Sequence, residues 1–296
     1  MKLSPSTVDV LTRAGLDPAH VQAVVTAAVA EDLAGGVDVT SEATIPADQR
    51  DTGDMVARAD GVVAGLPVAS AVLDLVGGGL ISHTTVVTDS SPVRRGDLLL
   101  TATGPTRALL TAERTMLNLV CRLSGIATLT AAWVGAVTGT GAVVRDTRKT
   151  TPGLRALEKY AVRAGGGANH RMALSDVALI KDNHVLAAGG VAAAFHAVRR
   201  AFPEVPVEVE CATVEQVREA VAAGADLILL DNMAPDLMRE AVSVAAPRGV
   251  RLEASGGLAL DNAREVAGTG VDFVSVGALT HSAPVLDIAF DLRERT

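Results

Sequence analysis

Residues 207–255 read VEVECATVEQVREAVAAGADLILLDNMAPDLMREAVSVAAPRGVRLEAS, in which three short apolar runs alternate with two longer helical patterns. The apolar runs are 207–210, 227–231 and 251–255, and the helical patterns are 213–223 and 235–245. Short runs bounded by turn residues are typical of buried strands, whereas longer amphipathic segments are typical of helices. Repeated strand–helix units of this length predict a parallel sheet with right-handed crossovers.

The alternation continues on both sides of this stretch. Further strands are expected at 142–147, 177–181 and 273–276, and further helices at 152–163, 187–201 and 261–267. Pro152 suits the first position of its helix, and the glycines at 165–167 suit its end. Six strands with polar residues at their carboxyl ends favour a (β/α) barrel of TIM type, complete or incomplete. An open doubly wound sheet is the alternative, although its usual GxGxxG turn is absent from the sequence.

The N-terminal part of the chain follows another pattern. Residues 19–33 form an amphipathic helical pattern, and 54–110 contain short apolar stretches interrupted by glycine, as in a strand-rich layer. From Thr111 the pattern becomes helical again. The expected domains are an N-terminal α/β domain at 1–113 and the barrel with the active site at 114–281, with a tail at 282–296 that is able to return to the first domain.

Composition narrows the function classes. The formal net charge is −8 and the pI about 5.3, which argues against a general nucleic-acid or membrane-surface binder. Cys121 and Cys211 are too few for a disulfide framework or a structural zinc site. The start of the chain lacks the pattern of a signal peptide, and no apolar stretch reaches the roughly 18 residues of a membrane span. We therefore expect a soluble cytoplasmic protein.

Basic residues are concentrated in one part of this acidic chain. Residues 145–184 contain eight of the 26 lysines and arginines. Such clustering costs self-repulsion unless anions occupy the site. Arg148 and Lys149 follow one apolar run and Lys181 follows the next, at strand ends where α/β proteins bind ligands. Arg171 adds a planar donor suited to carboxylates. The pattern predicts a pocket for a multiply charged anion.

The helix at 152–163 carries basic residues of its own. Arg155, Lys159 and Arg163 recur at helical spacing. We interpret these three as a solvated helix face with Glu158 as partner. His170 stands beside Arg171, where it could bind an anion or relay a proton, although a lone histidine is more often structural.

Acidic residues are expected at the mouth of the barrel. Side chains alternate along a strand, so Glu208 and Glu210 share one face, and in a barrel this face is the interior with Glu210 at the mouth. Asp231 ends the next strand and is expected at an equivalent height. Adjacent carboxylates repel unless they share a cation, and Mg²⁺ with substrate phosphate oxygens would serve. The alternative is that these acids pair with Arg148, Arg171 or Lys181.

Two glycine turns follow the last two strands. Ser255, Gly256 and Gly257 come directly after RLEA, and Gly277 follows FVSV. Backbone amides in such turns, with a helix N-terminus nearby, form the phosphate site common in barrels. The complete set of groups suits a phosphoribosyl pyrophosphate donor with an acidic acceptor.

These residues and the runs around them resemble the quinolinate phosphoribosyltransferase family. The matching runs are EDLAGGVDVTS (31–41), ERTMLNLVCRLSGIAT (113–128), DTRKTTPGLRALEKYAVRAGGGANHR (146–171), LIKDNH (179–184), VEVE (207–210), LLDN (229–232) and EASGG (253–257). The resemblance implies an N-terminal α/β sandwich domain beside an incomplete (β/α) barrel. It also implies a homodimer with shared active sites, or a higher oligomer built from it, in which Arg114 reaches the neighbour's site.

The resemblance further implies a reaction. Phosphoribosyl passes from phosphoribosyl pyrophosphate to quinolinate with loss of CO₂, giving nicotinate mononucleotide and pyrophosphate, with Mg²⁺ as cofactor. Residues that match the family's quinolinate-binding positions are Arg114, Thr147, Arg148, His170, Arg171 and Lys181. Residues that match the phosphoribosyl pyrophosphate site are Lys149, Glu210, Asp231, Ser255, Gly256, Gly257, Gly277 and His281. The implied catalytic residues are Lys149, Lys181, Glu210 and Asp231, and the implied metal ligands are Glu210 and Asp231.

Other functions fit parts of the sequence. Lys181 at a strand end near a phosphate site would also suit a Schiff-base aldolase or lyase. A related phosphoribosyltransferase that acts on another acid, such as the paralogues found with molybdate transport, would keep the same groups. A phosphosugar-sensing protein is a third alternative, but a sensor has no need of the carboxylate pair.

Overall fold

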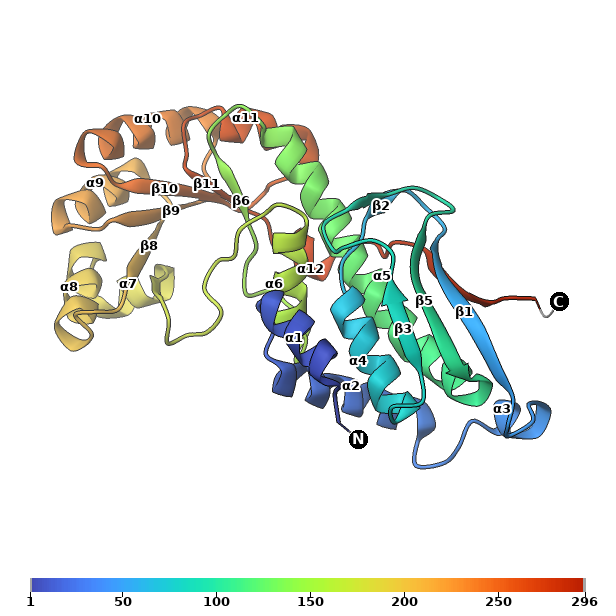
Figure 1. Cartoon of the computed structure of the whole chain (residues 1–296). Helices are drawn as coiled ribbons and strands as arrows, with labels where there is room; N and C mark the ends of the chain where they lie inside the picture. Colours follow the sequence, from blue (N-terminus) through green and yellow to red (C-terminus); the bar gives the residue numbers. More distant parts are fainter. Residues whose placement is uncertain (1, 295–296) are drawn as a thin grey trace. The chain divides into compact units, whose positions relative to one another are not determined.

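The computed structural model describes residues 2–294, which form two compact units. The first unit comprises the chain up to Leu129, residues 151–166 and the segment from Ser282 onward. The second unit comprises residues 130–150 and 167–281. The division differs from the expected boundary near residue 113, because helix α5 (Thr106–Val137) continues unbroken through that position (Figure 1).

The first unit is built on an antiparallel sheet with the strand order β12-β1-β5-β3. The strands are β1 (Arg50–Ala57), β3 (Ser82–Thr85), β5 (Leu98–Pro105) and β12 (Ile288–Leu292). The C-terminal strand pairs with β1 from Gly53 opposite Leu292 to Ala57 opposite Ile288. The tail of the chain therefore completes the sheet of the first unit.

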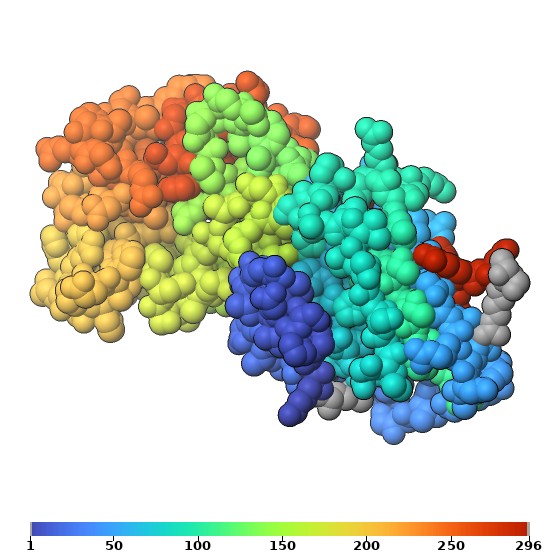
Figure 2. Space-filling model, in the orientation of Figure 1, coloured from blue at the N-terminus to red at the C-terminus, as the bar shows by residue number. Residues whose placement is uncertain are grey.

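Helices and one short strand pair complete this unit. They are α1 (Pro5–Arg13), α2 (Pro18–Leu33), α3 (Val39–Thr44), α4 (Leu66–Gly77) and α6 (Arg155–Ala164), with β2 (Gly61–Val62) paired to β4 (Pro92–Val93). Helix α1, dark blue in Figure 2, lies at the surface of the unit. Helix α2 matches the helix expected at 19–33, and its N-cap Asp17 accepts the N–H of Ala19.

Helix α5 is the longest element among the described residues. By length and composition it could cross a membrane, with half of its most apolar window buried inside the structure. The side chains of Leu109, Met116 and Val120 are completely buried. This burial is typical of the core helix of a globular unit, and core helices pass the same test of length and composition.

Helix α6 corrects two expectations. It begins at Arg155 and not at Pro152, because Thr151 uses its N–H and hydroxyl to bind the Glu158 carboxylate (3.0 and 2.7 Å) and residues 152–154 form a turn. Its expected solvated face is wrong for Lys159 and for the partner Glu158, which are completely buried, whereas Arg155 is half-buried and Arg163 is exposed. The helix packs into the first unit with charged side chains inside.

The second unit contains a parallel sheet of six strands in the order β6-β11-β10-β9-β8-β7. The strands are β6 (Val143–Arg145), β7 (Ala178–Ile180), β8 (Val207–Cys211), β9 (Leu227–Asp231), β10 (Arg251–Ser255) and β11 (Phe273–Ser275). All six expected strands are confirmed. Among the described residues β6 and β7 remain the two ends of the sheet, so the barrel is not closed. The observed fold is an incomplete barrel, and the alternative prediction of an open doubly wound sheet is wrong.

Helices α8 (Val191–Ala201), α9 (Val214–Ala223), α10 (Pro235–Ala245) and α11 (Ala263–Ala267) lie on the outside of the curved sheet (Figure 1). The short helices α7 (Asp182–Ala188) and α12 (Ala278–His281) and 3-10 turns at Ala246–Arg248 and Leu260–Asn262 complete the unit. Helix α9 begins with a capping box formed by Thr213 and Gln216. The single helix expected at 187–201 is two helices, because Gly189 and Gly190 both have positive φ.

Candidate functional site

A cavity of about 530 Å³ lies at the carboxyl ends of the parallel strands in the second unit. The predicted site residues in its lining are Thr147, Arg148, Lys149, His170, Arg171, Lys181, Glu210, Asp231, Ser255, Gly256 and Gly257. They follow five different strands or lie in the loop before β7. Parallel strands bring their carboxyl ends to one edge, so residues far apart in sequence meet there.

Three predicted site residues are not in this lining. Gly277 and His281 lie directly beside it, since a Cβ on Gly277 would stand 3.1 Å from Cδ of Lys149 and 3.2 Å from Nε2 of His281. The hydroxyl of Thr280 donates to the backbone carbonyl of Lys149 (2.8 Å) and fixes this corner. Arg114 is exposed on α5 in the first unit.

The basic side of the cavity is formed by Arg148 and Arg171. Nη1 of Arg171 donates to the carbonyl of Val177 (2.9 Å), and Nε of Arg148 is buried without a hydrogen-bond partner in the described part of the chain. Burial and the neighbouring charge of Arg148 lower the pKa of Arg171. Two adjacent guanidinium groups with spare donors form a strong site for an anion, because the anion removes their repulsion.

The acidic side is formed by Glu210 and Asp231. Oε2 of Glu210 lies 3.1 Å from Nζ of Lys181, so the alternative that this acid pairs with a lysine is confirmed for Glu210. The expected equal height of the two acids is wrong: Glu210 is level with Leu229, and Asp231 is level with Ser255. Asp231 therefore lies two residues nearer the mouth.

Both acids are partly exposed. Together with Asp182 they also line an adjoining cavity of about 260 Å³. Carboxylate oxygens are hard ligands of the kind that Mg²⁺ prefers. The donor chemistry at this edge therefore fits a divalent cation shared with substrate oxygens.

A buried polar network lies behind His170, in the barrel interior. Nε2 of His170 lies 2.9 Å from Oε2 of Glu208 and 3.4 Å from Oε1 of Glu253. Glu253 in turn pairs with Nη1 of Arg145 and accepts from the hydroxyl of Ser275, both at 2.5 Å. Both carboxylates are completely buried. The interior position expected for Glu208 is thus observed.

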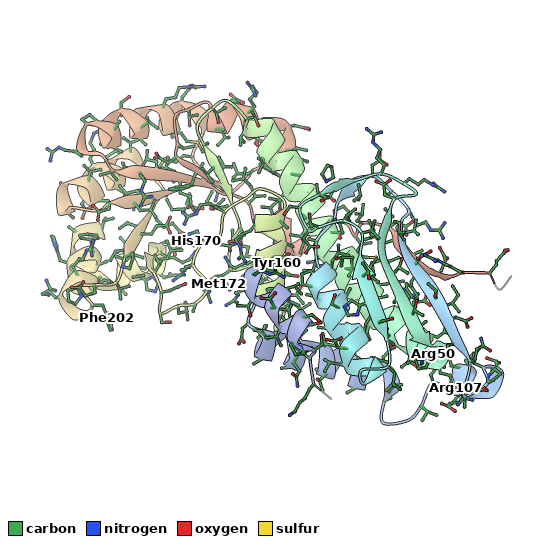
Figure 3. The ribbon with its side chains drawn as sticks, in the orientation of Figure 1. Arg50, Arg107, Tyr160, His170, Met172 and Phe202 are labelled. Carbon is green, nitrogen blue, oxygen red and sulfur yellow. The ribbon has the colours of Figure 1, made fainter. Side chains whose placement is uncertain are left out.

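The protonation of His170 is set by opposing influences. Burial lowers its pKa, but hydrogen bonds with Glu208 and Glu253 outweigh burial and raise the pKa to about 9. The backbone N–H of Arg171 donates to Nδ1 (2.7 Å), which favours the neutral ring and acts against this rise. Both ring nitrogens thus have partners within the protein. His170, labelled in Figure 3, lies on the segment between α6 and β7 and holds the backbone of Arg171 through Nδ1.

The network could be mistaken for a metal centre. Ligand atoms of His170, Glu208 and Glu253 all lie within 4.8 Å of one another. Glu253, however, already has the guanidinium of Arg145 as counter-charge. His170 lies at ion-pair distance from Glu208, while neither carboxylate oxygen of Glu208 has a well-aligned hydrogen-bond partner in the described part of the chain. Charge pairing with Arg145 and His170 therefore accounts for the arrangement without a metal ion.

Sequence reasoning missed Arg145, Glu253 and Ser275 as members of this network. The signal was present for Glu253, which interrupts the apolar run 251–255 as Glu208 interrupts 207–210. An acid in the middle of a buried strand has to be paired. Its partner, His170, comes from a loop whose path the sequence did not reveal.

A second cavity of about 580 Å³ lies in the first unit. Its lining is mainly hydroxyl and apolar side chains, with Arg13, His83 and Asp89 as the titratable members. Asp89 is already used, because it accepts the N–H groups of Gly65 and Leu66 and the hydroxyl of Tyr160. This cavity lacks the cluster of cations and acids found in the second unit.

Comparisons with known proteins give one family for both parts of the chain. The model of the quinolinate phosphoribosyl transferase N-terminal domain matches residues 38–124, and that of the C-terminal domain matches residues 126–291. The carboxylating nicotinate-nucleotide pyrophosphorylase of Mycobacterium leprae is 55% identical over 270 residues, which cover 90% of this chain and 94% of the relative. The decarboxylating quinolinate phosphoribosyltransferase 1b of Nicotiana tabacum is 37% identical over 298 residues, covering 93% of this chain and 84% of the relative.

Solved structures give the same similarity. The nicotinate-nucleotide pyrophosphorylase from Francisella tularensis superposes with a TM-score of 0.88 at 36% identity, over 93% of this chain and 96% of that one. The similarity extends over both units of the chain.

Proposed function

This chain belongs to the quinolinate phosphoribosyl transferase family, and on that premise we propose that it transfers phosphoribosyl from phosphoribosyl pyrophosphate to quinolinate. CO₂ and pyrophosphate are released and nicotinate mononucleotide is formed, a step of NAD biosynthesis. One observation carries the proposal: a single cavity is lined by two arginines, two carboxylates and a glycine turn.

The arginine side suits quinolinate. Arg148 and Arg171 supply planar donors for the two adjacent carboxylates of the substrate, and Thr147 and Lys181 add further donors in the same lining. His170 holds the backbone of Arg171 through Nδ1. In this proposal it acts on quinolinate chiefly through Arg171.

The acidic side suits the sugar. When the bond between ribose and pyrophosphate breaks, positive charge develops on the ribose, and Glu210 and Asp231 are fixed anions that stabilise it. Lys149 lies close to Gly277 and His281 and suits the departing pyrophosphate. The turn Ser255–Gly257, with Gly277, suits the 5′-phosphate.

Decarboxylation follows from the product of transfer. Once the ring nitrogen carries the ribose, it is a pyridinium beside the 2-carboxylate. Loss of CO₂ leaves an electron pair on C2 that the positive nitrogen stabilises, and C2 then takes up a proton. The protein needs mainly to orient the ring and to keep the 2-carboxylate out of water.

Mg²⁺ is part of the proposal. Glu210 and Asp231 would hold it, directly or through water, since both carboxylates face open cavities. The ion would supply positive charge to the pyrophosphate oxygens. Glu210 also forms an ion pair with Lys181. This ion pair limits how many carboxylate oxygens of Glu210 are available to the metal ion.

We further propose a homodimer in which Arg114 of one subunit completes the neighbour's site, or a higher oligomer built from it. Arg114 is exposed, as this role requires, and does not line the cavity of its own chain. A cytoplasmic location, without nucleic acid or membrane as partner, fits the small-molecule substrates and the net charge of −8.

The alternatives are weaker on structural grounds. A Schiff-base lysine has to be deprotonated, which burial or a neighbouring cation favours. Nζ of Lys181 instead lies 3.1 Å from the Glu210 carboxylate, which favours the protonated amine. A phosphoribosyltransferase for another acid keeps the same groups, so the substrate has to be tested directly.

The test is an assay with quinolinate, phosphoribosyl pyrophosphate and Mg²⁺, followed by detection of nicotinate mononucleotide and CO₂. Nicotinate in place of quinolinate is the control, since it lacks the 2-carboxylate. Formation of product with quinolinate, but not with nicotinate, supports the proposal. A folded protein that forms no product, or that uses nicotinate equally well, contradicts it.

A further inference from the structure

Asn232 has an unusual backbone at the edge of the cavity. Its φ is +52°, and only two other non-glycine residues in the described chain, Ala34 and Ser90, have positive φ. Asparagine tolerates this left-handed conformation better than most residues, but it still costs free energy. Asn232 directly follows Asp231 at the end of β9 and lines the cavity.

The left-handed backbone turns Asn232 across the end of β10. Its N–H donates to the carbonyl of Ser255 (2.9 Å), and its Nδ2 donates to Oδ1 of Asp231 (3.0 Å). The same side chain covers Gly256 so closely that a Cβ there would stand 2.4 Å from Oδ1 of Asn232. One residue thus contacts both the acid of β9 and the glycine turn of β10.

These contacts have little value for folding. The side chain of Asn232 is exposed, and a solvent-exposed hydrogen bond contributes little to the free energy of unfolding. Backbone strain that persists without a clear gain in stability is typical of functional sites. Asn232 is therefore better explained by the geometry it imposes on its neighbours.

We propose that Asn232 is a positioning residue for phosphoribosyl pyrophosphate. It holds the Asp231 carboxylate at a fixed place relative to the Ser255–Gly257 turn, so that the ribose and the 5′-phosphate of one molecule meet both partners together. The proposal rests on the proposed function of these two elements. Gly256 is its steric complement, because only a residue without a Cβ fits beneath the amide.

The main test is Asn232→Gly, which keeps the left-handed backbone and removes the amide. The expected result is a loss of about tenfold in kcat/KM for phosphoribosyl pyrophosphate, as for one lost orienting hydrogen bond. KM for quinolinate and the melting temperature should stay close to those of the parent protein. Unchanged kcat/KM for phosphoribosyl pyrophosphate would overturn the proposal, and so would a rise in KM for quinolinate as large as that for phosphoribosyl pyrophosphate.

Asn232→Asp gives a second measurement. Aspartate keeps the size and tolerates the backbone, but it replaces the Nδ2 donor by an acceptor beside Oδ1 of Asp231. A larger loss than in Asn232→Gly is expected. Full activity in Asn232→Asp would show that no donor is needed and would contradict the proposal.

Ala34→Gly is the matched control, because it relieves the same kind of backbone in the first unit, at the end of α2. Its kinetics should equal those of the parent. Asp231→Asn distinguishes the proposed role of Asp231 from the positioning role of Asn232. If Asp231→Asn stays fully active, the proposed role of Asp231 fails; if it loses activity while Asn232→Gly does not, only the positioning role of Asn232 fails.

Discussion

Nη2 of Arg122 lies 2.9 Å from Oε1 of Glu158, whose side chain is completely buried in the first unit. Arg122 also donates through Nε to the same carboxylate (3.2 Å) and through Nη1 to the carbonyl of Ala283 (3.2 Å). One arginine of α5 thus binds α6 and the chain that leads to β12. The pair joins three separate parts of the sequence.

Arg122→Met should destabilise the protein by about 3 kcal/mol, because it leaves the buried Glu158 without its cation. Urea unfolding measures the change. Arg239→Met is the control, since Arg239 pairs with Asp236 at the surface and its loss should cost less than about 0.5 kcal/mol. Equal effects of the two substitutions would contradict the importance of the buried pair.

Stability should depend on pH through His170. Its pKa in the folded protein is raised to about 9 by Glu208 and Glu253, above the roughly 6.5 of an unfolded chain. Protonated His170 therefore stabilises the folded protein, and this contribution to the free energy of unfolding is fully present below pH 6.5. The contribution is lost as the pH rises through 9. The N–H of Arg171 favours the neutral ring, so the loss should begin before pH 9.

The measurement is urea unfolding of the parent and of His170→Gln between pH 6 and 10. The difference between the two proteins should shrink towards high pH. A constant difference would show that the pKa of His170 is the same in the folded and unfolded protein.

Arg148→Met should raise KM for quinolinate by roughly 10- to 100-fold, the value of a lost charge-assisted hydrogen bond. KM for phosphoribosyl pyrophosphate should change little, because the proposal assigns that substrate to Glu210, Asp231 and the glycine turns. Steady-state kinetics with each substrate varied in turn distinguish the two effects. An increase confined to phosphoribosyl pyrophosphate would reverse the assignment of the two sides.

Complementation tests the shared site. Arg114→Ala should raise KM for quinolinate strongly, and Asp231→Asn should lower kcat by roughly 10²-fold for a lost electrostatic contact. In mixed dimers one site carries both substitutions and the other carries neither. Mixing the two inactive variants should therefore restore about a quarter of the parent activity at random assembly. If no activity returns although mixed dimers form, Arg114 acts within its own chain.

The strands were predictable because their signal is local. Buried parallel strands are short apolar runs, and all six lie within the runs at 142–147 to 273–276 or within one residue of their ends. The clustering of Arg148, Arg171, Glu210 and Asp231 followed from the same topology, since the ends of parallel strands share one edge.

The predictions were wrong or incomplete where contacts with distant chain segments determine the burial or role of a residue. Lys159 recurs at helical spacing with Arg155 and Arg163, which predicted a solvated face with Glu158 as partner. Packing of α6 into the first unit buries Lys159 and Glu158, and Glu158 pairs with Arg122. Asn232 has no sequence signal beyond its place after a strand, because its role depends on the path of β10. Heights across the sheet depend on register, which the sequence of a single strand does not contain.

The first unit is assembled from three separate parts of the chain, and its sheet receives strand β12, which is synthesised long after β1. During synthesis β12 must leave the ribosome before β1 can gain this neighbour. Until then β1 has an unpaired edge, which is a site for mispairing with other chains. The nascent protein is therefore expected to need a chaperone. A fragment that ends at residue 113 would lack parts of the first unit and should not fold by itself.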